Sequence, residues 1–459
     1  MCTCLIAGRN ATRTGRVMLA ANGDWDDTPA VVLHAPRARH EAGESFVLTG
    51  GGLLPQPEET WGYVYTAFAY AIGTLDRAWI FGLNDRGVAA AGTGASAFKE
   101  IPCAGAALEP DDVLRLLLER AESARDGIRM IGELTARYGM RPSGLASCAS
   151  MATYAVADRR EGWFLEMAPG NHWIAQRVPD DEAAMRANAF GIHDADLTDP
   201  ENVMASPGLA DYARARGWWD GDDRHFDFAG AYGAEVSPNE WGPELDPMNM
   251  RRRWRAMCLL SGKTRDEDAP EYAVRPAKKL ALSDLTDILR DVYRGTAYDL
   301  TTVPAAGPWG DPFHDDPASY SLCRRATDNS IAADFSPPGQ PVMWTALSSP
   351  GASAYIPIWA DIAALPAVCG GLAPEESLFG EWQELLRLTR ERYSVRAGAV
   401  REALDAYERA MAVRLDREAA ELSGLSPAEG RDRRTAWTRE HIEEARRLCR
   451  RLTEEFQKE

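Results

Sequence analysis

The stretch directly after the initiator methionine constrains the fold of this chain more than any other part of the sequence. Cys2 to Ala7 reads as a short strand, Gly8 to Gly15 as a polar connection, and Arg16 to Asn22 as a second strand. This order predicts a β-hairpin at the very start of the chain. Such a hairpin would hold the terminus inside a sheet, where it cannot fray.

Cys2 begins this hairpin and carries the chemistry that we expect there. A residue as small as cysteine at position 2 permits removal of Met1, which leaves one residue with both a thiol and a free α-amine. The ordinary pKa values of these groups are about 8 for the amine and about 8.5 for the thiol, so they can exchange a proton near neutral pH. Cys2 is therefore a candidate nucleophile with its own base. The alternative is a cysteine without a catalytic role, since position 2 tolerates most residues.

Charge and composition exclude several classes of partner. The formal net charge is −18 at pH 7, which repels nucleic acid and anionic membrane surfaces. The N-terminus lacks a basic segment followed by an apolar one, and no apolar run reaches the roughly 18 residues of a membrane span. We therefore expect a cytoplasmic protein. The eight cysteines are scattered and predict neither a disulfide framework nor a zinc knuckle.

The middle of the chain mixes hairpins with a pair of helices. Trp79 to Ala91 reads as a hairpin whose turn contains Asn84, an acidic start at Pro110 opens the first helix, and a second helix runs from Gly127 to Tyr138. Strands resume between Ala152 and Arg177. This order predicts an α+β fold with largely antiparallel strands. Further along, 194–272 reads as long loops and short helices, and 341–347 with 354–358 as another strand pair.

The last part of the chain has a different character. After about Ala373, apolar residues recur every three or four positions among many charges, in two stretches separated near Ser423 to Gly430. We predict a main domain over residues 2–375 and charged amphipathic helices over 376–459. These helices would pack on the main domain or on a second subunit, which leaves a homo-oligomer open.

Several motifs resemble peptidase family C69, the cysteine dipeptidases. The N-terminal motif comprises Cys2 to Gly8, Gly15 and Asn22 to Trp25, and the resemblance extends over roughly the first three quarters of the chain. Its further blocks are Gly162 to Met167, His172 to Asp181, Ala187-Asn188, Met204 to Pro207, Arg252 to Arg255, and the Trp344 to Ile358 hairpin. The resemblance implies an N-terminal-nucleophile hydrolase fold, a four-layer αββα sandwich. It also implies hydrolysis of small linear amides, typically dipeptides, through an acyl-thioester on Cys2 and without a metal or cofactor.

The resemblance also implies roles for particular residues. Asp24 matches the family's acid and would orient the terminal amine or the thiol. Asn188 matches an asparagine whose amide is aimed at the oxyanion. Backbone N–H groups near Thr93 or Gly94 are candidates for a second donor or for substrate binding, and Arg253 matches an arginine directed at the nucleophile. Asn84, by contrast, we interpret as a turn residue.

Three residues beside the nucleophile depart from the family pattern. Ala21 stands where relatives often carry Arg or His, and Gly23 stands in place of a Glu. A missing cation would leave the thiol pKa less depressed. Cys4 replaces a usual threonine and lies on the same strand face as Cys2. It is interpreted as a packed core cysteine, with a resolving thiol as the alternative.

Two other functions fit the same sequence. The departures at Ala21 and Gly23 would also suit a relative that uses the Cys2 thioester to transfer an acyl group to an amine. A non-enzymatic, secernin-like protein could use the charged C-terminal helices as a binding surface. The pairs His193-Asp194 and His314-Asp315 have metal-ligand residue types but lack a second cluster, so no metal is expected.

Overall fold

The predicted N-terminal hairpin is the centre of the first of two large sheets. The computed structural model describes residues 2–25, 28–68, 79–95, 97–143, 150–234, 247–267, 271–314, 320–335 and 341–459. In it, β1 (Cys2–Ala7) and β2 (Met18–Asp24) pair antiparallel, which confirms the hairpin. The first sheet has the order β14-β1-β2-β16-β17-β18, with β14 (Ala183–Arg186), β16 (Thr327–Asp334), β17 (Val342–Leu347) and β18 (Ile356–Trp359). The first strand of the chain thus has a partner on each side.

The second large sheet has eight strands in the order β15-β13-β12-β11-β10-β9-β8-β3. All its described pairings are antiparallel, as the alternating hairpins predict. Its members are β3 (Ala30–Ala35), β8 (Tyr63–Phe68), β9 (Ile80–Asn84), β10 (Ala89–Ala95), β11 (Met151–Ala157), β12 (Gly162–Ala168), β13 (His172–Arg177) and β15 (Val203–Ala205). Two small ribbons extend one edge of the molecule: β4 (Ala38–Arg39) with β7 (Glu59–Thr60), and β5 (Ser45–Val47) with β6 (Leu53–Pro55).

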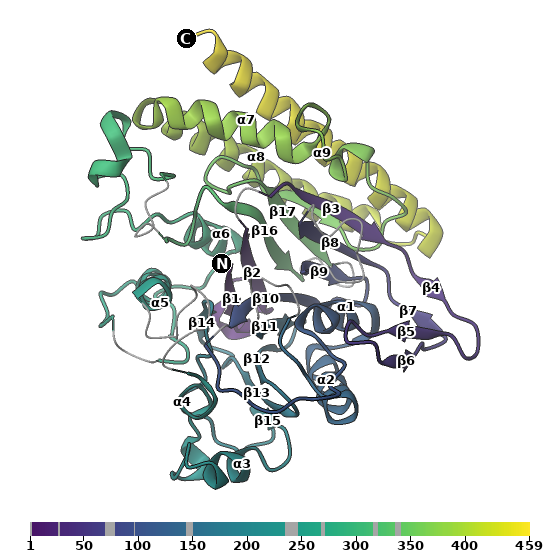
Figure 1. Cartoon of the computed structure of the whole chain (residues 1–459). Coiled ribbons are helices and arrows are strands. Elements are labelled where there is room, and N and C mark those ends of the chain that lie inside the picture. The colour runs from purple at the N-terminus through teal and green to yellow at the C-terminus, as the bar shows by residue number, and fades with distance from the viewer. Residues whose placement is uncertain are drawn as a thin grey trace.

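Helices cover the outer face of each sheet and complete four layers. On the second sheet, α1 (Pro110–Arg120) and α2 (Ala124–Tyr138) pack against β9 to β12. On the first sheet lie α6 (Leu282–Leu289), α7 (Leu378–Glu391), α8 (Tyr393–Glu421) and α9 (Pro427–Gln457), with α7, α8 and α9 side by side (Figure 1). The α+β fold and the αββα sandwich are therefore confirmed.

The two sheets pack directly against each other. β1 and β2 contact β10 and β11 of the second sheet. The approach is close where Gly162 faces Ile6, since a Cβ on Gly162 would lie 2.4 Å from Cγ2 of Ile6. Cys2 and Cys4 occupy the same face of β1 as Ile6. They consequently point into the space between the sheets.

The region predicted as loops and short helices contains one substantial helix. α3 (Leu209–Ala215) and α4 (Phe228–Tyr232) are short, as expected, but α5 (Pro247–Ser261) has 15 residues. Its buried stripe includes Asn249, Arg252 and Arg253 beside Ala256, Met257 and Leu260. Because polar residues fill four of the seven buried positions of α5, hydrophobic periodicity does not mark this segment as a helix.

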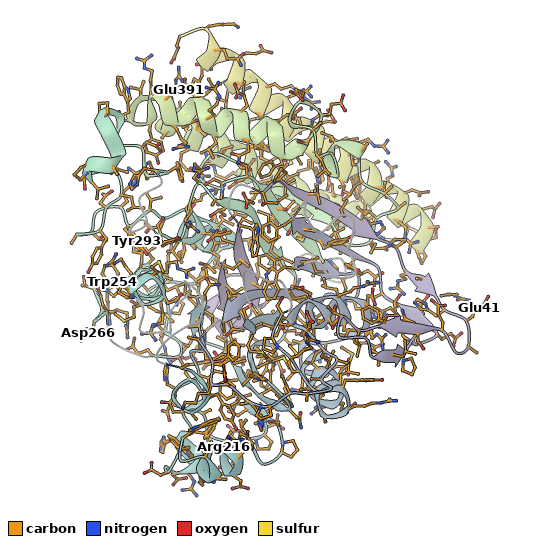
Figure 2. All side chains as sticks on the ribbon, in the orientation of Figure 1. Glu41, Arg216, Trp254, Asp266, Tyr293 and Glu391 are labelled. Carbon is orange, nitrogen blue, oxygen red and sulfur yellow. The ribbon has the colours of Figure 1, made fainter. Side chains whose placement is uncertain are left out.

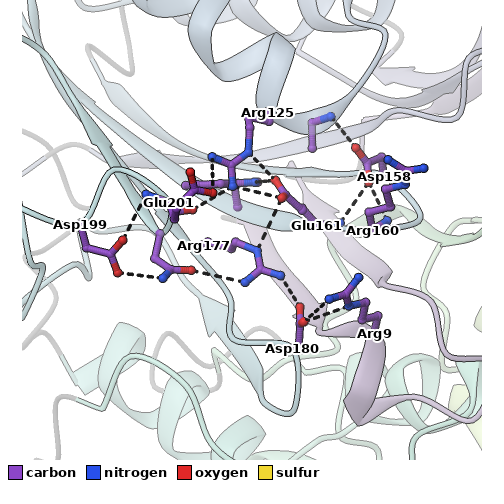
Figure 3. A network of polar contacts seen from close by, with 12 residues as sticks. Arg9, Arg125, Asp158, Arg160, Glu161, Arg177, Asp180, Asp199 and Glu201 are labelled. Atoms are coloured by element: carbon purple, nitrogen blue, oxygen red, sulfur yellow. Dashed lines mark hydrogen bonds and ion pairs between the residues drawn. The ribbon is translucent and has the colours of Figure 1, made fainter.

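A polar network closes the end of the sandwich away from Cys2 (Figure 3). Arg125 at the start of α2 donates two hydrogen bonds of 3.0 Å to Glu161 in the turn between β11 and β12. Arg177 at the end of β13 pairs with Asp180, which also accepts from Nε of Arg9 at 2.9 Å. These ion pairs join α2, the second sheet and the connection that follows β1.

A buried ionic cluster docks the C-terminal helices on β18. Glu418 of α8 accepts hydrogen bonds from Arg414 at 2.6 Å and from the indole of Trp359 at 3.2 Å, and lies 2.9 Å from Nε2 of His441 on α9. Nδ1 of His441 lies 3.0 Å from the carbonyl oxygen of Pro357. His441 thus connects α8 to the end of β18 through its two ring nitrogens. Burial raises the pKa of Glu418, but the bonds from His441 and Arg414 outweigh it and lower the pKa.

The C-terminal helices thus pack on the first sheet of the same chain. The division into residues 2–375 and 376–459 stays a prediction, and association with a second subunit does too. Although α8 and α9 are long, none of the helices in the described ranges has an apolar stretch that could cross a bilayer.

We expect Glu418→Ala to lower the free energy of unfolding by about 2–5 kcal/mol, because it leaves the buried ring of His441 and the indole N–H of Trp359 without their hydrogen-bond partner. Urea denaturation would measure this. Glu421→Ala is the matched control: the ion pair of Glu421 with Arg417 is largely exposed, so its loss should change stability by less than about 0.5 kcal/mol. Equal effects of the two substitutions would contradict the role of the cluster.

Candidate active site

Cys2 lies buried at the end of β1, where several segments meet. Its side chain is 5% exposed, and its Cα pairs with Gly23 of β2. Its backbone nitrogen donates to Oδ1 of Asn188 at 2.8 Å. Burial raises the pKa of the thiol and the nearby charge of Asp24 adds to the rise, while a backbone N–H of Asp24 opposes it. Burial thus favours the thiol form of Cys2 over the thiolate.

The segment that carries Asn188 is held to the second sheet by two neighbouring threonines. Thr93 of β10 pairs with Thr153 of β11, so their side chains lie together on one face. The hydroxyl of Thr93 donates to the carbonyl oxygen of Ala187 at 2.7 Å, and that of Thr153 donates to Ala189 at 3.1 Å. The residues on both sides of Asn188 are therefore hydrogen-bonded to the second sheet.

The carboxamide orientation of Asn188 follows from its neighbours. Its Oδ1 faces two donors, the backbone nitrogen of Cys2 at 2.8 Å and Nη2 of Arg252 at 3.0 Å, so this atom must be the oxygen. Its Nδ2 donates to the carbonyl oxygen of Gly94 at 3.0 Å. The structure thus brings Cys2, Asn188 and Gly94 together, as their selection from the sequence anticipates. The predicted donation from Asn188 to an oxyanion stays a prediction.

Arg252 reaches the site from α5, and all three nitrogens of its guanidinium make hydrogen bonds there. Nη1 donates to the carbonyl oxygen of Cys2 at 2.8 Å and lies 3.3 Å from Oγ1 of Thr3. Nη2 donates to Oδ1 of Asn188 at 3.0 Å and to Oδ1 of Asn249 at 2.8 Å. Nε donates to the carbonyl oxygen of Met248 at 3.1 Å. Because all of these partners accept, the buried cation is stabilised in place.

The arginine selected from the sequence was Arg253, one residue along. Arg253 is also buried, at 4% exposure, but the guanidinium that reaches Cys2 is that of Arg252. One turn of α5 places Asn249 beside Arg252, and its Oδ1 also accepts from the backbone nitrogen of Asn188 at 3.1 Å. The missed signal is this spacing of three residues between an asparagine and an arginine on one helix face.

Asp24 ends β2 and is completely buried. Its Oδ1 accepts a hydrogen bond of 2.6 Å from the hydroxyl of Thr327 on β16, which pairs with it across the sheet. Burial raises the pKa of Asp24, and the guanidinium groups of Arg324 and Arg252 oppose that rise. Neither Thr327 nor Arg324 was selected from the sequence, since β16 and the residues before it carry no motif.

Gly23 is required by its neighbours, which explains the departure from the family pattern. Gly23 lies between Cys2 of β1 and Asn329 of β16 in one row across the sheet. A Cβ on Gly23 would lie 2.8 Å from Nδ2 of Asn329 and 3.1 Å from Cε2 of Phe81. Asn329 is held there by a 2.9 Å hydrogen bond from the hydroxyl of Thr66. The space that a larger residue 23 would take is thus filled by the Asn329 carboxamide.

The structure also bears on Cys4, on Asn84 and on the two His-Asp pairs. Cys4 is 1% exposed within the core and burial raises its pKa well above the usual value, which fits a packed cysteine. Asn84 is confirmed as a turn residue, since its Oδ1 accepts from the backbone nitrogens of Arg86 and Val88. Over the described ranges, no cluster of His, Cys, Asp or Glu could hold a metal ion. His193 instead contacts Asp227 at 3.0 Å, and residues 315–319 lie outside the described part.

Comparison with known proteins gives a consistent result. The model of peptidase family C69 matches residues 1–389. The probable dipeptidase of Latilactobacillus sakei is 26% identical over 313 residues, which cover 65% of this chain and 62% of that protein, less than two thirds of its length. The probable dipeptidase of Salmonella dublin is 28% identical over 324 residues, 65% of this chain and 68% of its own.

Solved structures give a more distant likeness. Penicillin V acylase from Agrobacterium tumefaciens matches 78% of this chain and 85% of its own at 13% identity, with a TM-score of 0.37.

We expect Gly23→Ala to destabilise the protein by about 1–3 kcal/mol, because the new methyl group collides with Asn329 and Phe81. The double variant Gly23→Ala/Asn329→Ala should recover part of this loss, and urea denaturation of the single and double variants would give the coupling. Gly398→Ala in α8 is the control: nothing lies within 4 Å of its Cβ position, so helix propensity should stabilise the protein slightly. Strictly additive effects at residues 23 and 329 would contradict the proposed collision.

Proposed function

Since the chain belongs to peptidase family C69, we propose that it hydrolyses small linear amides, dipeptides above all, with Cys2 as an N-terminal nucleophile after removal of Met1. The relatives named dipeptidase support this choice of substrate. The single observation that carries the mechanism is the 2.8 Å contact between the backbone nitrogen of Cys2 and Oδ1 of Asn188. Removal of Met1 would turn this nitrogen into an α-amine that is already held in position.

The held amine is the base in the proposed first step. Its hydrogen bond to Asn188 directs one hydrogen away from the thiol, so the nitrogen lone pair can turn toward the sulfur. As the sulfur attacks the amide carbon, the thiol proton passes to the amine, and the charge of Asp24 favours the ammonium that forms. The ammonium then gives the proton to the leaving amine. Water hydrolyses the thioester by the reverse proton path.

Arg252 is a positioning residue in this proposal. It binds the carbonyl oxygen of Cys2 and the Oδ1 of Asn188 at once, so the nucleophile and its amine partner share one rigid anchor. Its contacts with Asn249 and Met248 fix the guanidinium to α5. The geometry of the nucleophile is therefore set by residues distant in sequence.

Stabilisation of the oxyanion is assigned to Asn188 and the end of β10. Nδ2 of Asn188 has two hydrogens, and one is used on the carbonyl oxygen of Gly94. We assign the second hydrogen to the oxyanion, with a backbone N–H of Thr93 or Gly94 as the further donor. One such donor is typically worth about 10²–10³ in rate.

The mechanism predicts that Met1 is absent from the active protein and that Cys2→Ala lowers turnover of dipeptides by roughly 10³-fold or more. Intact mass and assays on a dipeptide library would test this. Cys4→Ala is the matched control, since it removes a thiol from the same strand face and should retain most of the activity. Full turnover by Cys2→Ala, or by protein that retains Met1, would contradict the mechanism. Added amines test for acyl transfer: hydrolysis predicts free amino acids as the products and no new amide.

The positions of the two arginines predict different outcomes for the same substitution. Arg252→Lys replaces a five-donor fork by one ammonium and leaves buried acceptors unpaired, so kcat should fall by about 10²-fold or more. Arg253→Lys should have a much smaller effect on kcat. Steady-state kinetics on one dipeptide, with circular dichroism to verify folding, would compare them. Equal losses, or a larger loss in Arg253→Lys, would contradict the assignment to Arg252.

A further inference from the structure

Arg324 is a second guanidinium at this site, and its side chain is not committed to other residues. It lies half-buried just before β16, with its guanidinium carbon 4.1 Å from the centre of the Tyr320 ring. For the described residues, no side-chain hydrogen bond or ion pair of Arg324 is found. Its backbone nitrogen donates to the hydroxyl of Thr327 at 3.0 Å. Arg324 is therefore an anchored cation with its donors available.

Its place at the catalytic centre follows from Thr327 and Asp24. The Thr327 hydroxyl that accepts from the Arg324 backbone donates in turn to Oδ1 of Asp24 at 2.6 Å. The charge of Arg324 also acts on both Asp24 and Arg252, since it lowers the pKa of each. The backbone of Arg324 thus lies two hydrogen bonds from the Asp24 carboxylate, beside the proposed catalytic groups.

Arg324 makes a cation–π contact with Tyr320, which uses none of its N–H groups in a hydrogen bond. A guanidinium that lies flat over an aromatic ring keeps its N–H groups in the plane, where they can bind a carboxylate through two parallel hydrogen bonds. Tyr320 itself is fixed, because the hydroxyl of Tyr293 donates to its carbonyl oxygen at 2.7 Å. Figure 2 shows Tyr293 near Trp254 of α5, the helix that also carries Arg252.

A free dipeptide substrate carries a negative charge that a cation in the site would balance. Its C-terminal carboxylate lies one residue beyond the scissile bond and would meet the negative charge of Asp24 in a largely buried site. Arg252 cannot offset this charge by binding the substrate, because its donors already bind Cys2, Thr3, Asn188, Asn249 and Met248. Arg324 has no comparable engagement.

We infer that Arg324 binds the C-terminal carboxylate of the substrate and so selects free dipeptides over blocked or longer amides. This inference rests on the proposed function. It assigns to Arg324 a substrate-binding role separate from the positioning role of Arg252. Tyr320 acts through Arg324 by holding the plane of its guanidinium.

The test compares alanyl-alanine with its C-terminal amide on Arg324→Gln and on the unsubstituted enzyme. We expect kcat/KM for the free acid to fall about 10- to 100-fold, mainly through KM, as the loss of a charge-assisted hydrogen bond predicts. Turnover of the amide should fall much less, so the preference for the free acid shrinks or disappears. Arg324→Lys keeps the charge and should restore part of the preference. Arg409→Gln, on the exposed face of α8, controls for net charge and should leave the preference intact.

Other outcomes would overturn the inference. Equal losses on the acid and the amide, together with a shifted pH profile, would mean that Arg324 acts only through the ionisation of Asp24. An unchanged preference in Arg324→Gln would mean that the carboxylate binds elsewhere. If the unsubstituted enzyme hydrolyses neither compound, the proposed function fails. Calorimetric binding then still tests Arg324. The Cys2→Ala variant must bind the free acid more tightly than the amide, and the double variant Cys2→Ala/Arg324→Gln must lose this difference.

Discussion

The structure depends on one constraint: the first strand of the chain lies between β2 and β14 and is covered by the second sheet. Its first described residue, Cys2, is buried together with its backbone polar groups. Each of them must therefore find a partner within the protein. The backbone nitrogen of Cys2 finds Asn188, and its carbonyl oxygen finds Arg252. The contacts that satisfy the backbone of Cys2 also hold the proposed nucleophile, so folding and pre-organisation of the proposed site are one event.

This arrangement explains why α5 carries polar residues on its buried face. A buried guanidinium is costly unless its donors are accepted, and the acceptors of Arg252 come from β1, from the segment after β14 and from α5 itself. The result is a rigid connection among three distant segments. A change in any one of them would disturb the others, since the oxygen of Asn188 is shared by Cys2 and Arg252.

The surroundings of Cys2, the proposed nucleophile, are specialised in two ways. Asn329 fills the space beside Gly23, so the departure at residue 23 belongs to a packing arrangement that spans both sheets. Arg324 places positive charge close to Asp24 although residue 21 is an alanine. The C-terminal helices lie elsewhere, on β17 and β18. There a buried ionic cluster gives the edge strand β18 hydrogen-bond partners in place of water.

The sequence by itself determined the N-terminal hairpin, the antiparallel α+β pattern and the family, because alternation and short motifs depend on adjacent residues. It also led to the prediction of Cys2, Asp24 and Asn188 as site residues. Only the tertiary structure decided which arginine reaches Cys2, since Arg252 and Arg253 both lie on the buried stripe of α5 and differ by one helical step. β16 also escaped prediction, because its buried positions hold Thr327, Asp328, Asn329 and Ser330, which resemble a loop in sequence. Partners that lie hundreds of residues apart satisfy these polar groups, and no local pattern encodes such partners.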